Sequence, residues 1–258
     1  MLTHVPMRYI SGAKQRCWLD STIRVLLALI SIDTFYATAA PRFLVTQQSG
    51  EHFIRGIPGL STVGKGQYLP VGTSIFVRKD ARLEVQDQTG MFLRLGTMTN
   101  LVLKKPRELL LHKGAVLLFM PSDGIGYKLI SPLSEVTIVG PGALMMGVTE
   151  SGGIKTVGLH GEVDLALSNQ EHKTVQAGEL RFIFTEGRGF SRKVDVELAT
   201  LVQTAALIRD FEEPLPFLEA MMRDARHQNR RIRNRYRALV GDAKNDQEFE
   251  LKIIEEEE

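Results

Sequence analysis

The sequence predicts an all-β body followed by α-helices, and three observations support this fold class. Turn residues recur about every eight to twelve residues between Tyr68 and Phe190, which is typical of many short strands. Apolar and polar residues alternate between these turns, so each strand has one apolar face. Beyond residue 197 the apolar period becomes that of a helix. We expect short strands in a sandwich or a twisted, solenoid-like stack, followed by two C-terminal α-helices.

The β body is predicted to occupy residues 67–192. Gly or Pro recurs there before three helical turns could form, which excludes an ordinary helix. The residues predicted on one face of the sheet are Leu83, Val85, Leu93, Leu95, Leu101, Leu103, Val136, Ile138, Val163, Leu165 and Leu167. Those predicted on the opposite face include Arg82, Glu84, Arg94 and Asp164.

The helical region is predicted to occupy residues 194–241. A first helix has apolar residues at helical spacing over Leu198–Ile208 and ends before Pro214. A second helix carries apolar residues over Leu218–Leu239. Gly241 is its predicted stop, because glycine commonly follows the last helical turn.

The segments that flank these two regions are less regular. Residues 41–66 are rich in Gly, Ser, Gln and Thr and are predicted to be a linker or an irregular first strand. Residues 242–258 end in four glutamates and are predicted to be a solvated acidic tail.

The first forty residues have the pattern of a signal peptide. Basic residues precede the short apolar run Val25–Ile32, and small residues stand before Pro41. Asp33 interrupts the run after eight residues, whereas a membrane-spanning helix needs about twenty. We expect residues 1–40 to be cleaved near Ala40, which would leave a periplasmic or secreted protein. An uncleaved inner-membrane anchor through residues 23–40 and an ordinary buried helix are the alternatives.

Composition restricts the class of protein further. The only cysteine, Cys17, lies in the predicted signal peptide, so the cleaved protein would have no disulfides. The formal net charge is only +2, which does not indicate a nucleic-acid partner. A chain of 258 residues with 43% hydrophobic residues can fill a core without disulfides. These features suit a bacterial periplasm or cell exterior.

Eight short pieces of the strand ladder follow one another over about 110 residues: Leu69-Pro70-Val71-Gly72-Thr73-Ser74-Ile75, Ala81-Arg82-Leu83-Glu84-Val85, Gly90-Met91-Phe92-Leu93-Arg94-Leu95, Thr99-Asn100-Leu101, Lys113-Gly114-Ala115-Val116, Val136-Thr137-Ile138-Val139-Gly140, Gly161-Glu162-Val163 and Ala177-Gly178-Glu179. In wording and order these pieces resemble the FecR family. Pro141 departs from the family, which usually has Thr after the glycine that is Gly140 here.

The resemblance implies a sensing or protein-binding domain of the bacterial envelope. FecR regulators combine a cytoplasmic anti-sigma segment, one membrane span and a periplasmic β region that receives a signal from an outer-membrane receptor. Some two dozen residues precede the apolar run here, which is too few for that cytoplasmic domain. We therefore expect a free-standing exported FecR-like domain rather than the full anti-sigma regulator.

The sequence offers no recognisable catalytic, cofactor-binding or metal-binding site. It contains no H-E-x-x-H, G-x-S-x-G, Walker or G-x-G-x-x-G motif. His160 and His172 are the closest histidine pair in the β body, and zinc would need further ligands. We predict that the protein is not an enzyme. A hydrolase with a carboxylate pair in a β cleft is the less favoured alternative.

The second predicted helix is strongly basic. Its arginines are candidate contacts to an anionic membrane surface or cell-wall polymer. Between residues 217 and 240 seven arginines stand against two acidic residues, a formal charge of +5. The alternatives are a solvated face that the acidic tail neutralises, or pairing within an assembly, since residues 242–258 carry eight acidic residues against two lysines, a charge of −6. The seven arginines are Arg223, Arg226, Arg230, Arg231, Arg233, Arg235 and Arg237.

The sequence thus predicts a non-enzymatic, exported module that senses or binds a protein partner in the envelope. We expect an exposed strand edge to bind the partner, because its unpaired N–H and C=O groups can form hydrogen bonds with an incoming strand. The alternative is an envelope-associated structural protein that assembles into homo-oligomers and holds an anionic surface through its basic helix.

Overall fold

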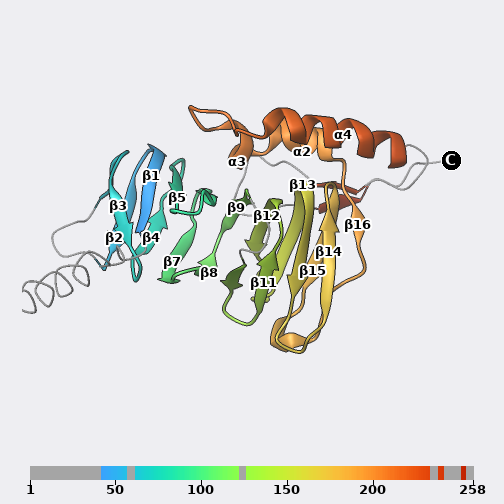
Figure 1. Ribbon diagram of the computed structural model, residues 1–258, viewed down its shortest axis with the longest axis horizontal. Helices are drawn as coiled ribbons and strands as arrows, with labels where there is room; N and C mark the ends of the chain where they lie inside the picture. Colours follow the sequence, from blue (N-terminus) through green and yellow to red (C-terminus); the bar gives the residue numbers. More distant parts are fainter. Residues whose placement is uncertain (1–41, 57–61, 122–125, 233–237, 241–250, 254–258) are drawn as a thin grey trace, which may run out of the picture. The chain divides into compact units, whose positions relative to one another are not determined.

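The computed structural model describes residues 42–56, 62–121, 126–232, 238–240 and 251–253 (Figure 1). The predicted signal peptide lies outside the described residues. Residues from Ala40 to Glu258 belong to one compact unit. Within the described ranges, no helix has the length and apolar character needed to cross a membrane.

The described strands form one sixteen-stranded sheet and one two-stranded sheet. The sixteen are β1 (Arg42–Ser49), β2 (His52–Arg55), β3 (Tyr68–Pro70), β4 (Ser74–Val77), β5 (Arg82–Gln86), β6 (Phe92–Leu95), β7 (Asn100–Lys105), β8 (Glu108–Lys113), β9 (Ala115–Met120), β10 (Tyr127–Ile130), β11 (Glu135–Val139), β12 (Gly142–Val148), β13 (Ile154–Ala166), β14 (His172–Gln176), β15 (Glu179–Ile183) and β16 (Val194–Asp195). The two-stranded sheet pairs β17 (Ala238–Val240) with β18 (Leu251–Ile253).

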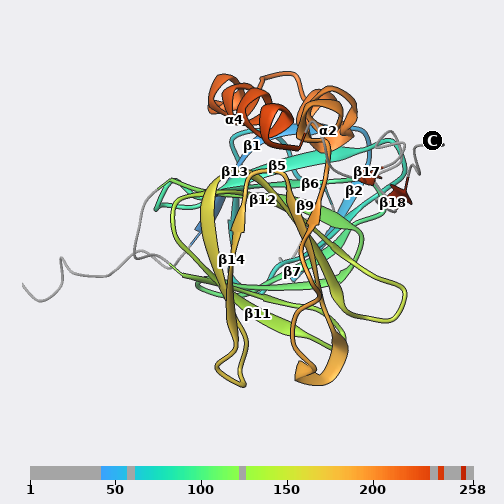
Figure 2. The same cartoon turned by 90° about the vertical axis from the view of Figure 1, so that its right-hand side faces the viewer.

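The large sheet curls so that two halves face each other (Figure 2). One half, which we call the covered half, consists of β3, β1, β5, β6, β9, β12, the first part of β13, β15 and β16. The other, the open half, consists of β2, β4, β7, β8, β10, β11, the last part of β13 and β14. One apolar core lies between them, and it contains inward-facing residues of both halves, such as Leu83 and Leu93 opposite Leu101 and Val136.

The chain coils by passing repeatedly from one half to the other. Gly114 joins β8 of the open half to β9 of the covered half. Its φ is +93°, and a Cβ there would lie 2.5 Å from the Thr99 hydroxyl, so only glycine fits this corner. The long strand β13 belongs to both halves. Its residues Ile154–Gly161 pair with β12 of the covered half, and its last residues pair with Thr137–Val139 of β11 in the open half. The predicted fold class, a mainly β body of many short strands, is therefore confirmed.

In the described part of the chain, three α-helices follow β16 where two were predicted: α2 (Leu198–Thr204), α3 (Ala206–Arg209) and α4 (Leu218–Ile232). The first predicted helix is interrupted at Ala205, whose backbone is extended with a ψ of 121°. The described part of the second predicted helix ends at Ile232, and Leu239 lies in strand β17 instead. A short 3-10 turn, η1 (Thr185–Gly187), precedes them.

The helices lie along the outer face of the covered half (Figure 1). A second apolar core forms there, in which Leu201, Met221 and Ala225 of the helices pack with Leu117 and Met145 of the sheet. The covered half therefore packs apolar residues on both faces, whereas the open half has helices on neither face among the described residues.

Two flanking segments contain regular structure. Residues 41–66 contain two strands of the large sheet: β1, which pairs with β5, and β2, which pairs with β4. Leu251–Ile253, inside the predicted acidic tail, pair with β17. Leu251 and Ile253 are apolar residues within the predicted acidic tail, which suits strand pairing better than full solvation.

Candidate interaction surfaces

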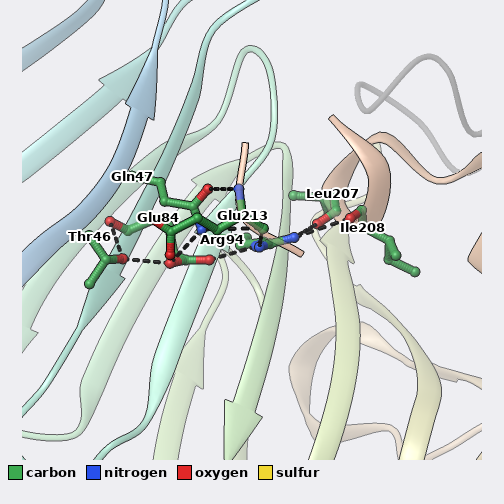
Figure 3. A network of polar contacts seen from close by, with 7 residues as sticks. All are labelled: Thr46, Gln47, Glu84, Arg94, Leu207, Ile208 and Glu213. Atoms are coloured by element: carbon green, nitrogen blue, oxygen red, sulfur yellow. Dashed lines mark hydrogen bonds and ion pairs between the residues drawn. The ribbon is translucent and has the colours of Figure 1, made fainter. Parts of the chain in front are cut away.

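A buried polar network fixes the helices to the covered half (Figure 3). The Arg94 side chain is fully buried, and its Nε donates to Glu84 Oε2 at 2.7 Å. Its Nη1 donates to the carbonyl oxygens of Leu207 at 3.3 Å and Ile208 at 3.2 Å, at the end of α3. Its Nη2 donates to the carbonyl oxygen of Glu213 at 2.6 Å. One guanidinium thus satisfies three carbonyl groups that a short helix and its following loop leave unpaired.

The partners of Arg94 are themselves bonded. Thr46 Oγ1 donates to Glu84 Oε1 at 2.6 Å, and Gln47 Nε2 donates to the same oxygen at 3.0 Å. The Phe211 ring lies 4.1 Å from the guanidinium carbon. Burial is the largest effect on the pKa of Arg94 and lowers it, while the bond to Glu84 acts in the opposite direction. No buried side-chain atom of Arg94, Glu84 or Gln47 lacks a hydrogen-bond partner, so we assign the network to helix attachment.

A second attachment is made by Gln228 of α4, which is 3% exposed. Its Nε2 donates to the carbonyl oxygens of Gly178, at 3.0 Å, and Val196. Its Oε1 accepts from the N–H of Leu198 at 3.1 Å, at the start of α2. Gly178 has a φ of +81°, and a Cβ there would collide with the Gln228 amide at 2.0 Å. Glycine at 178 therefore makes room for the side chain that positions α4.

The histidines considered from the sequence have separate partners. His160 Nδ1 lies 2.6 Å from Asp224 Oδ2 of α4, and its ring stacks on Phe217 at 5.8 Å between centroids. His172 Nδ1 lies 2.9 Å from the carbonyl oxygen of Gln170. No group of three His, Cys, Asp or Glu side chains suited to a metal ion occurs in the described part of the chain.

The basic helix presents arginines to solvent. Arg223, Arg226 and Arg230, which we call the arginine stripe, are exposed and succeed one another at spacings of three and four residues, so they share one side of α4. Arg231 is also exposed, and its Nη1 lies 3.4 Å from Gln176 Oε1. Arg233, Arg235 and Arg237 lie outside the described residues.

The outer face of the open half carries apolar side chains, which the sequence analysis did not single out. Phe53 pairs with Phe76 across β2 and β4, and Val102 pairs with Leu110 across β7 and β8. Ile130 of β10 is opposite Leu110. Phe53 is 47% exposed and the other four are half-buried. We call these five residues the apolar row: Phe53, Phe76, Val102, Leu110 and Ile130.

The apolar row ends at a free strand edge. Strand β2 pairs only with β4 and stands at the end of the strand order in the described sheet. A shallow cavity of about 490 Å³ lies beside it, lined in part by Phe53, Phe76 and Val102. Arg55 is exposed on β2, and the Arg78 guanidinium lies 5.5 Å from the centre of the Phe53 ring. The signal in the sequence was a bulky apolar residue, Phe76, at a position that alternation assigns to the solvent face.

Comparison with known proteins gives no family. No family model and no curated protein matches the chain, so the FecR resemblance stays a prediction. Two crystal structures of a proposed anti-sigma factor from Parabacteroides distasonis are similar to it. One has a TM-score of 0.40 at 15% identity, covering 58% of this chain and 74% of that chain. The other has a TM-score of 0.37 at 13% identity, covering 70% and 99%.

Proposed function

We propose that this protein is a non-enzymatic, exported module that binds an extended segment of an envelope protein along the apolar row and the free edge of β2. The observation that carries the proposal is the asymmetry of the two halves. Helices α2 to α4 occupy the outer face of the covered half, whereas the outer face of the open half keeps large apolar side chains half-exposed. Apolar rows of this kind are typical of interaction sites.

The chemistry of the surface defines the partner. A strand added to β2 would gain main-chain hydrogen bonds from the free edge, and its alternate side chains would reach the cavity beside Phe53 and Phe76. Arg55 at the same edge favours a carboxylate on the partner. We therefore expect an extended segment with alternating apolar residues and at least one acidic residue. The predicted export and the FecR resemblance of the sequence support a partner in the bacterial envelope.

Site-specific photo-crosslinking in the native host tests the surface. A photoreactive phenylalanine at position 53 is expected to give one discrete adduct with an envelope protein, and Phe76→Asp is expected to abolish it. The matched control is the same probe at Tyr68, which is 58% exposed on the edge strand β3 of the covered half. Equal adducts from both positions, or none from position 53 in a stable protein, would contradict the proposal.

Export is tested by N-terminal sequencing of the protein from fractionated cells. The signal-peptide pattern predicts a chain that begins at Ala40 or Pro41, in the periplasm or the medium. An uncleaved chain in the inner-membrane fraction would support the anchor through residues 23–40 instead. An intact Met1 in the cytosol would exclude both and remove the envelope partner from the proposal.

A further inference from the structure

The arginine stripe concentrates positive charge on the outer side of α4. Its members, Arg223, Arg226 and Arg230, extend over about 10 Å of the helix axis, since a helix rises about 1.5 Å per residue. Like charges at these spacings repel each other on a helix surface. Among the described residues none of the three has an ion-pair partner. A negatively charged ligand would therefore lower the free energy of this surface.

The acidic side chains on one flank of α4 are bonded to other groups and do not neutralise the stripe. Asp224 Oδ2 lies 2.6 Å from His160 Nδ1, and Glu162 Oε1 accepts a hydrogen bond from Gln176 Nε2 at 2.9 Å. Both acids line a cavity of about 330 Å³ between α4 and strands β13 and β14. Glu219, in the first turn of α4, forms no ion pair within the described ranges. The stripe thus offers its positive charge to a ligand from solvent.

An exposed apolar side chain stands beside the stripe. Met222 is 45% exposed and precedes Arg226 by one helical turn, so the two side chains are neighbours. Apolar residues on the opposite side of α4, such as Met221 and Ala225, are buried against the sheet. A membrane surface offers anionic headgroups with apolar chains beneath them, whereas a soluble polyanion offers only charge. The combination of arginines with Met222 therefore favours a lipid surface.

From the unpaired arginines and the exposed methionine beside them, we propose that α4 binds the anionic headgroups of a phospholipid membrane. The guanidinium groups donate hydrogen bonds to phosphate oxygens, and Met222 enters the interface between headgroups and acyl chains. Because α4 lies on the outer face of the covered half (Figure 1), the apolar row on the open half stays accessible to a protein partner. The two surfaces share no residue, so failure of one proposal leaves the other standing.

Cosedimentation with vesicles tests the proposal. The protein used is the chain from Ala40, which is one compact unit and lacks the basic and apolar residues of the first 39 positions. It is expected to bind vesicles that contain phosphatidylglycerol and not vesicles of phosphatidylcholine alone. Binding should fall between 0.1 M and 1 M salt, where the Debye length decreases from about 10 Å to about 3 Å. Equal binding to both kinds of vesicle would overturn the proposal.

Charge variants assign the binding to the stripe. Each arginine near an anionic membrane strengthens binding about five-fold, so replacing Arg223, Arg226 and Arg230 together by glutamine should weaken it roughly a hundredfold. Replacing the same three by lysine keeps the charge and should retain most of the binding. The matched control replaces three scattered, exposed cations by glutamine, and it should weaken binding much less; an equal loss would assign the effect to net charge and overturn the site. These cations are Lys79, Lys113 and Arg192.

Soluble polyphosphate separates a lipid ligand from other polyanions. Met222→Ser is expected to reduce binding to the phosphatidylglycerol vesicles several-fold and to leave binding to polyphosphate unchanged, because only the vesicles offer an apolar layer to this side chain. Unchanged vesicle binding by this variant would overturn the part assigned to Met222. Equal affinity of the unaltered chain for polyphosphate and for vesicles, at the same concentration of phosphate groups, would assign the stripe to soluble polyanions and overturn the lipid proposal.

Discussion

Arg94 is the residue on which the attachment of the helices depends most. It is fully buried, it pairs with Glu84, and its remaining donors go to carbonyl oxygens of α3 and the loop after it. Removing one partner of a buried ion pair destabilises the folded state, because the remaining charge is buried without an opposite charge beside it. Replacing both partners by apolar residues avoids that unpaired charge.

We predict that Arg94→Met lowers the free energy of unfolding by about 3–5 kcal/mol, because Glu84 then stays buried without its cation. The double variant Arg94→Met, Glu84→Leu should lose less. Urea denaturation followed by circular dichroism measures both. Lys65→Ala, which breaks an exposed ion pair, should leave the midpoint unchanged, and an equal loss in all three variants would refute this account.

Alternation in the sequence correctly assigned Arg94 and Glu84 to the face opposite the core residues Leu83 and Leu93. It could not show that this face is buried. The groups that cover it, such as the carbonyl oxygen of Ile208, come from more than a hundred residues downstream. A period of two describes which side chains share a face, and it contains no information on what packs against that face.

At the scale of the element, α4 is held through Gln228 and through its apolar side. We predict that Gln228→Ala releases α4 before the sheet unfolds, since Gly178, Val196 and Leu198 would each lose a buried hydrogen bond worth about 1 kcal/mol. Hydrogen exchange should show the amides of α4 exchanging faster while those of β9 stay protected. Asn229→Ala, at the adjacent exposed position, is the control and should change neither.

The helices illustrate where sequence patterns stop being sufficient. The spacing of Leu198, Leu201 and Ile208 correctly predicted helical residues that bury one side. The extended residue Ala205 was not predictable, because alanine favours helix and the break follows from packing of α2 and α3 on a curved sheet. Likewise, helical spacing continued through Leu239, whose strand pairing with Lys252 depends on a distant segment.

For the whole molecule, the decisive feature is that one half is covered and the other is open. We predict that a chain ending after Asp195 exposes the apolar outer face of the covered half, binds a hydrophobic dye strongly and forms large particles by light scattering. A chain ending after Ile232 keeps α2 to α4 and should behave like the full protein. A monodisperse, dye-free chain ending at 195 would contradict the role assigned to the helices.

The sequence does contain a signal for the covered half. Strands β9 and β12 are nearly continuous apolar runs, AVLLFM and GALMMGV, which is typical of strands buried on both faces. Strand β11 of the open half, EVTIV, instead has a polar residue between its buried Val136 and Ile138. The apolar row was harder to predict, because Phe53 and Ile130 are far apart in sequence and come onto the same face only through the intervening strands β4, β7 and β8.

Strand β13 has a mechanical consequence. It is one continuous backbone whose first part pairs with β12 under the helices and whose last part pairs with β11 of the open half. A strand added at β2 would therefore extend a sheet that continues through β13 into the strands beneath α4. The two outer faces are thus joined by one unbroken backbone as well as by hydrogen bonds between strands.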